Sequence, residues 1–262
     1  RIDKEGTTLR GARGCWPIIM SGGPLGTCID LVVVNADNAI LERIFIVHSA
    51  AGGHHSHAFR SDKPCNVRQA CWGGGAYNTS FPPGSKIQSC LIAPVGGPLG
   101  IEGPLEIRDL ITLHPDHGFE LRGEVGTHPS HIENILILGN ISISAPAIIS
   151  RATVLGYTWV RYDTVTVTHS ILAEVVGFIP GARIEYCGLI RGFTEKAKGG
   201  PGCFKIKPDF ADPGNLDYRL TPKTSIPAGI EVNKPLGFQY TPEMMELINV
   251  ALELRRRGII KF

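Results

Sequence analysis

The stretch Ile87-Gln-Ser-Cys90-Leu-Ile92 returns 20 residues later as Ile107-Arg-Asp-Leu110-Ile-Thr112. Both copies are apolar at the first and fourth places, polar at the second, and apolar or β-branched at the sixth. The same phrase begins again at Leu41, Val67, Ile132, Tyr162 and Ile184, so the steps are 26, 20, 20, 25, 30 and 22 residues. A constant phrase at variable spacing indicates coils whose strands stack in register while their loops differ in length.

The composition of these phrases favours strands. Val, Ile and Thr dominate them, and Gly, Pro, Asn or Ser follows most of them within a few residues. A βαβ unit needs about 30 residues or more, which most of the steps do not provide. The fixed Asn and Leu spacing of leucine-rich repeats is absent. The sequence therefore predicts an all-β fold, a parallel β-helix over residues 1–230, with Cys90 and Cys187 at core positions.

A different pattern begins near residue 240 and predicts a C-terminal extension, 231–262, that contains one α-helix over residues 242–256. Thr241 can cap the helix, a proline suits its first turn, and Arg255-Arg-Arg257 with Gly258 suits its end. Its expected apolar face consists of Met244, Leu247, Ile248, Ala251 and Leu252.

Charge and hydropathy exclude several classes of protein. The net charge of the 262 residues is +2, which argues against a strongly basic nucleic-acid binder. No run reaches 18 apolar residues, so the sequence predicts no membrane span. The chain opens at Arg1 without a methionine, and we expect it to be processed or cut from something longer.

The seven cysteines include no CxxC pair and no spacing typical of a zinc site. We expect mostly buried free thiols, with one disulfide possible in principle among Cys15, Cys28, Cys65 and Cys71. The redox compartment stays open on this evidence.

Stacking the phrases aligns their outward positions about 4.8 Å apart along the axis. The first outward column then ends in Glu133, Asp163 and Glu185, and calcium favours such clustered carboxylate oxygens. The alternative is a solvated charged face with modest ion pairs. The next outward columns are apolar, for example at Phe45 and Leu91, and an apolar stripe of this length must be covered. We expect the C-terminal helix or another copy of the chain to cover it.

A third column, seven residues after the start of each phrase, is rich in histidine. It reads His48, Gly74, Pro94, His114, Gly139, His169 and Arg191. His114 and His169 would stand two rungs, about 9.6 Å, apart, which is too far for one metal ion but suitable for a ligand chain lying along the column. The alternative is that these histidines only bond to neighbouring turns.

Two loops add candidates. His54-His-Ser-His57 lies between glycines, but no nearby carboxylate or cysteine completes a metal site. Trp72-Gly-Gly-Gly-Ala-Tyr77 places two aromatic residues beside flexible glycines, where they could stack on a sugar or simply act as a packing lid.

Several stretches resemble a known family. Gly118-Phe-Glu-Leu-Arg-Gly123, followed by His131-Ile-Glu-Asn-Ile-Leu-Ile137 and Gly139-Asn140, resembles the coil phrase of right-handed parallel β-helix proteins of the pectate-lyase-like superfamily. Residues 7–11 resemble an early coil, and residues 208–213 and 217–222 resemble the closing phrase of bacterial polysaccharide lyases and their relatives. The resemblance covers roughly residues 6–230. It departs at Ser225-Ile-Pro-Ala228, where the family phrase reads Ser-Pro-Ala.

The resemblance implies a right-handed helix and activity on an acidic polysaccharide, outside the cell or on a cell or virion surface. Such a lyase needs a base for the proton beside the uronate carboxylate and a cation to neutralise that carboxylate. We take His114, His169, Arg108 and Arg122 as candidate catalytic residues, with Arg161 and Lys196 as further parts. We take Gly139, Trp72, Tyr77 and Arg191 as candidate substrate-binding residues.

Two other functions stay open. A glycoside hydrolase would need two carboxylates, which Asp109, Asp116 and Glu120 could supply. The same fold also hosts phage tailspikes and adhesins, so a non-catalytic structural or adhesive module that self-associates through the apolar stripe is the main alternative.

Overall fold

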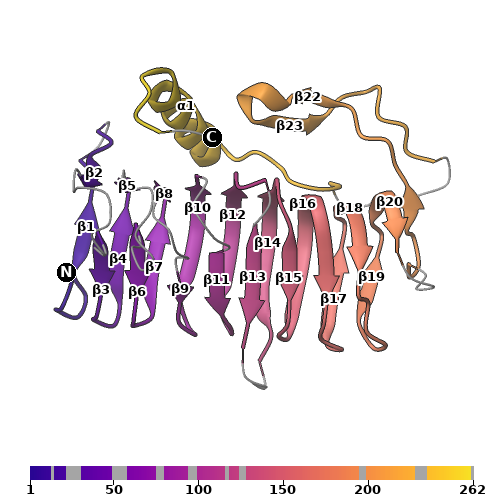
Figure 1. Cartoon of the computed structure of the whole chain (residues 1–262), viewed down its shortest axis with the longest axis horizontal. Helices are drawn as coiled ribbons and strands as arrows, with labels where there is room; N and C mark the ends of the chain where they lie inside the picture. The colour runs from indigo at the N-terminus through magenta and orange to yellow at the C-terminus, as the bar shows by residue number, and fades with distance from the viewer. Residues whose placement is uncertain are drawn as a thin grey trace.

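The computed structural model describes residues 1–12, 15–21, 31–48, 58–74, 80–93, 99–115, 118–123, 128–194, 199–227 and 235–260. Nineteen of the strands in these residues join into one sheet, and its pairs are parallel. The chain winds through this sheet as a parallel β-helix whose axis lies along the long direction of Figure 1. Each coil contributes short strands to three walls.

The first wall is the column of strands that precedes a sharp corner in each coil. It consists of β1 (Thr8–Arg10), β4 (Ala39–Glu42), β7 (Cys65–Arg68), the first parts of β10 (Lys86–Ile92), β12 (Glu106–Thr112), β14 (Ser130–Ile137) and β16 (Ala147–Val160), then β17 (Val165–Thr168) and β19 (Arg183–Glu185).

The second wall follows that corner. It consists of β2 (Ile18–Ser21), β5 (Phe45–His48), β8 (Cys71–Gly74), the later parts of β10, β12 and β14, the middle of β16, and the starts of β18 (Ile171–Val176) and β20 (Gly188–Phe193), with β21 (Phe204–Lys205). The third wall consists of β3 (Val32–Val34), β6 (Phe59–Ser61), β9 (Ser80–Phe81), β11 (Leu99–Glu102), β13 (Phe119–Arg122), β15 (Ile141–Ile143) and the ends of β16, β18 and β20.

In every coil from β4 onward, one residue in the left-handed backbone conformation makes the corner between the first and second walls. One residue per coil has a φ between 48° and 59° there, and none of them is glycine. These residues are Arg43, Gln69, Ser89, Asp109, Asn134, Arg151, His169 and Tyr186. A left-handed residue between two extended segments turns the chain sharply, and its repetition keeps the coils in phase.

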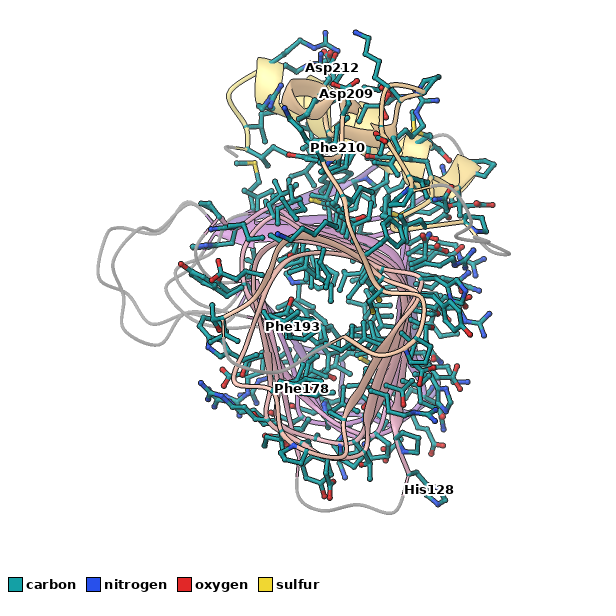
Figure 2. The ribbon with its side chains drawn as sticks, turned by 90° about the vertical axis from the view of Figure 1, so that its right-hand side faces the viewer. His128, Phe178, Phe193, Asp209, Phe210 and Asp212 are labelled. Atoms are coloured by element: carbon teal, nitrogen blue, oxygen red, sulfur yellow. The ribbon has the colours of Figure 1, made fainter. Side chains whose placement is uncertain are left out.

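The core fills the inside of the helix. The first, fourth and sixth places of the phrase point inward, as predicted, and Cys90 and Cys187 are fully buried there. Trp72 also points inward and packs against Phe59 and Phe81, with ring centroids 5.9 Å from each. At the C-terminal end, Phe178 and Phe193 pack edge to face inside the last coils (Figure 2).

The pairing corrects the predicted phrase at Tyr162. Ile149 pairs with both Ile132 and Val167, and Val167 pairs with Ile184. The 30-residue step therefore contains the corner of one further coil, and the true steps are 17, 18 and 17 residues. The apolar pattern missed this because the fourth place holds small residues, Ala152 and Ser170, in these two coils.

A C-terminal cover lies on the second wall. The helix α1 (Pro242–Arg256) has the bounds predicted from the sequence, and the Thr241 Oγ1 accepts a hydrogen bond of 3.3 Å from the Met244 backbone N–H. Its buried residues are Met244, Leu247, Ile248, Ala251 and Leu254. Leu254 rather than Leu252 thus completes the buried face, although Leu252 also packs partly against it.

The outward apolar columns of the second wall lie under this cover. Phe45, Leu91, Ile111 and Leu136 are fully buried in one cluster with the buried residues of α1. The hairpin formed by β22 (Phe210–Asp212) and β23 (Asp217–Leu220), with a short 3-10 turn (Pro213–Asn215) between, lies beside α1 on the same side of the coil (Figures 1 and 2). The predicted cover of the apolar stripe by the C-terminal helix is confirmed.

A strap of residues 236–241 leads into α1 across the left-handed corners. The Gly237 N–H donates to the His169 carbonyl at 2.8 Å, and the Phe238 N–H donates to the Thr153 Oγ1 at 2.9 Å. The Asn134 side chain then bonds both polar groups of the Gln239 backbone, at 2.6 and 2.7 Å. The strap therefore joins three successive coils.

Candidate functional site

His114 and His169 do not lie in one column. His114 follows the second-wall strand of its coil, whereas His169 occupies a left-handed corner. The His169 ring stacks on Tyr186 of the next corner, with centroids 5.5 Å apart and planes at 15°. The two histidines therefore do not flank one ligand position, which removes the predicted pair of proton-transferring groups.

Gly139 does not line an open groove, in contrast to the prediction. A Cβ at this position would lie 2.4 Å from the His114 carbonyl oxygen, so neighbouring backbone occupies the space beside it. The next rung holds Gly156, whose N–H donates to the Gly139 carbonyl at 3.0 Å. The glycines thus allow backbones to approach closely, and the predicted gap is filled.

The two predicted arginines lie on different walls. Arg108 projects from the first wall and Arg122 from the third, so they cannot clamp one carboxylate together. Trp72 has no exposed surface, so its indole cannot stack on a ligand. The candidates Tyr77 and Lys196, the cluster His54-His-Ser-His57 and Asp116 lie outside the described residues.

The predicted carboxylate column is interrupted. Between Glu133 and Glu185 the register places Ser150 and Thr168, and Asp163 lies outside the column. Within the part of the chain that the structure describes, no group of three or more His, Cys, Asp or Glu side chains could hold a metal ion. The described residues thus do not form the calcium site that the sequence suggested.

A hollow of about 410 Å³ does lie on the first wall. It is lined by Glu106, Ile107, Arg108, His131, Ile132, Glu133, Ile148 and Ser150. Its charges are already paired: Glu133 contacts Arg151 at 2.8 Å and Arg108 at 3.8 Å. Nitrogen-tipped side chains gather along this side of the coil in Figure 2. An anionic ligand would have to displace Glu133, so we regard this surface as a solvated ion-pair ladder.

A more promising surface lies on the third wall, near its C-terminal end. We call it the stacking patch and define it by Arg122, Tyr157, Trp159, Arg161 and Arg191. The Tyr157 and Trp159 rings lie 5.5 Å apart between centroids, and Tyr157 is 40% exposed. The alternation of β16 turns these two rings outward while Thr158 and Val160 point inward.

Local geometry fixes the aromatic pair. The register between β16 and β18 shifts between Val154 and Tyr157, which re-aims the end of β16. The Asn140 Oδ1 accepts a hydrogen bond of 2.8 Å from the Tyr157 N–H and so holds the strand after the shift. Gly139, a predicted substrate-binding residue, therefore lies next to the patch, one residue before the Asn140 that supports it.

Two guanidinium groups lie over the rings, and a third, that of Arg122, lies further along the same wall. Arg191 lies 5.8 Å from the Tyr157 ring centroid and Arg161 lies 5.9 Å from that of Trp159. The register aligns Arg122, Ser144 and Arg161 on successive rungs, so the two arginines stand about 9.6 Å apart with a short side chain between them.

The charge balance of the patch is positive. Arg191 contacts Glu174 at 3.2 Å and Arg122 contacts Glu120 at 2.6 Å. Arg161 makes no ion pair with any described residue, and its guanidinium lies over the Trp159 ring. The patch can therefore offer two aromatic faces and a charge-assisted hydrogen-bond donor to an anionic ring compound.

Sequence reasoning found Arg191, Arg122 and Arg161 but missed Tyr157 and Trp159. The signal was the strict alternation Tyr157-Thr-Trp-Val-Arg161, in which aromatic and basic residues share one side of a strand. The misplaced phrase at Tyr162 hid this alternation.

Comparisons with known proteins give no relative: no family model, no curated protein and no solved structure matches this chain. Of the helices in the described ranges, none is both long and apolar enough to cross a membrane.

Proposed function

We propose that this protein binds an acidic polysaccharide, a polyuronate, on the stacking patch. The observation that carries the proposal is the outward Tyr157–Trp159 pair with the Arg161 guanidinium over one ring. Aromatic faces suit the apolar faces of sugar rings, and a guanidinium fork suits a uronate carboxylate. Arg161, which forms no ion pair with any described residue, suits a carboxylate of a sugar chain lying over these rings.

Binding is better supported than cleavage. β-Elimination needs a base within hydrogen-bond reach of the proton beside the carboxylate. The predicted bases His114 and His169 lie in different columns, and Glu174 beside the patch is paired with Arg191. We therefore propose a binding protein and expect no unsaturated product.

The alternative of an assembly module loses its main argument. That argument was an apolar outer stripe that had to be covered, either by the C-terminal helix or by another copy of the chain. The described stripe is buried by the protein's own α1 and strap, so it no longer calls for a second chain.

The experiment measures the affinity for polygalacturonate by calorimetry or affinity electrophoresis, with variants W159A and R161A. Loss of one charge-assisted hydrogen bond should weaken binding about tenfold, since about 1.4 kcal/mol corresponds to a factor of ten. R161K should fall between, because lysine keeps the charge but not the planar fork.

The matched control is R183A, which removes an equally charged, exposed arginine from the first wall. It should leave the affinity unchanged. Equal losses of affinity in R183A and R161A would indicate nonspecific charge attraction. Unchanged affinity in W159A would show that the stacking patch is not the binding site. Release of unsaturated product would show a lyase and overturn the binding-only proposal.

A further inference from the structure

Two cysteines face each other on the last rungs of the second wall. Gly188 pairs with Phe204, so Cys187 and Cys203, one residue earlier on each strand, are neighbours on adjacent rungs. Adjacent rungs place their Cα atoms about 4.8 Å apart, within the 4.4–6.8 Å that disulfides span. Both are free thiols in the structure, and both lie on the inner side of the wall, where Cys187 belongs to the core of the helix and Cys203 packs against it.

The environments of the two thiols differ in a useful way. Cys187 is fully buried, whereas Cys203 is partly exposed. The neighbouring Cys187 thiol lowers the pKa of Cys203 to about 7, while the Cys203 side chain and burial both raise the pKa of Cys187. The partly exposed Cys203 thiol is thus the better nucleophile at neutral pH, and the buried Cys187 thiol lies beside it, where it can attack a mixed disulfide of Cys203.

We infer that Cys187 and Cys203 form a reversible thiol–disulfide site that fastens the last coil when a small-molecule disulfide is present. The Cys203 thiolate attacks one sulfur of the oxidant, forms a mixed disulfide and releases one thiolate. Cys187 then attacks the Cys203 sulfur and expels the second thiolate, which takes up the Cys187 proton. The two protein thiols lose two electrons and two protons, and the oxidant becomes two thiols.

The chain provides an internal control for this geometry. Cys71 and Cys90 also lie on adjacent coils, but Cys71 pairs with Leu91, so Cys90 is one residue out of register. Cys90 points into the core and Cys71 lies under the cover, on opposite sides of the wall. Two cysteines on adjacent coils can therefore form a disulfide only if they are also in register and on the same side of the wall.

The experiment incubates the full chain with glutathione and glutathione disulfide at graded ratios, then blocks free thiols under acid denaturation. Trypsin separates the two cysteines onto peptides 184–191 and 199–205, which mass spectrometry finds joined only if the disulfide has formed. We expect the joined peptides to increase with the oxidant and a Cys71–Cys90 link to be absent.

Two variants test the assigned roles. C187A should stop at the mixed disulfide of Cys203 with glutathione, and C203S should form neither product on Cys187. The rate of Cys203 alkylation should reach half its maximum near pH 7 in the unaltered chain and at higher pH in C187A. Absence of the joined peptides under the most oxidising condition, or the same products with and without Cys187, would overturn the inference.

Discussion

Replacing Leu247 with alanine tests whether α1 belongs to the core of this protein or only rests on it. Leu247 is fully buried against the outward apolar columns of the second wall. Both ends of α1 are fixed, by the strap at its start and by a 3.2 Å hydrogen bond from Arg255 to the Gly214 carbonyl at its end. The helix therefore cannot collapse fully into the space that a smaller side chain would leave.

Buried leucine-to-alanine changes cost about 2–5 kcal/mol, and the restricted relaxation here suggests about 3 kcal/mol. That is a large share of the roughly 5–15 kcal/mol by which a typical domain is stable. The assay is guanidinium unfolding followed by far-ultraviolet circular dichroism, with helical and strand signals recorded separately. Both signals should shift to lower denaturant together in L247A.

The matched control is N249A, an exposed position two residues further along the same helix. It should change the free energy of unfolding by less than about 0.5 kcal/mol. A shift below about 1 kcal/mol in L247A, or a helical signal that is lost alone while the strands stay folded, would refute an integral cover.

Two further predictions concern single positions in the coils. Burial raises the pKa of Asp109 above its ordinary value, so the ionised carboxylate destabilises the folded state. At a pH above this raised pKa, D109N should therefore be more stable than the unaltered chain, and the difference should vanish at a pH below the pKa of the unfolded state. Thermal melts recorded across pH measure it. The control D163N, at an exposed carboxylate, should change the free energy of unfolding by less than about 0.5 kcal/mol. G139A should cost about 1–3 kcal/mol because its Cβ would meet the His114 carbonyl oxygen at 2.4 Å, whereas G214A, with 3.6 Å to its nearest neighbour, should be nearly neutral in the same chemical denaturation.

The fold could be predicted from the sequence because six of the seven phrases obey one inward pattern. Strand composition, coil length and the capped C-terminal helix all favoured the architecture that the structure has. The pattern failed where an inward place holds Ala152 or Ser170, since small and polar residues carry no hydrophobic signal. The Ser170 hydroxyl is satisfied there by donating to the Thr168 carbonyl at 2.8 Å and accepting from the Ala152 N–H at 3.0 Å.

The site could be predicted only in part, because a surface is assembled by register between coils. One missed corner shifted His169 into the wrong column and hid Trp159. Trp72 and Trp159 are the same residue type near glycines or turns, yet one is in the core and the other partly exposed. The inward sixth place of the phrase already favoured a buried Trp72, whereas nothing local to Arg122 and Arg161 shows that they share a column.

The cover is the last part of the chain to be synthesised, and this order has a consequence for folding on the ribosome. The coils of the second wall leave the ribosome before α1, and their outward residues, Phe45, Leu91 and Ile111 among them, are then without the surface that buries them. A nascent chain with its coils already stacked would present a continuous apolar strip to solvent or to a chaperone until the strap and helix emerge. A ribosome that pauses before the codons of residues 236–256 would prolong that exposure, so the timing of translation over this short segment bears directly on the yield of folded protein.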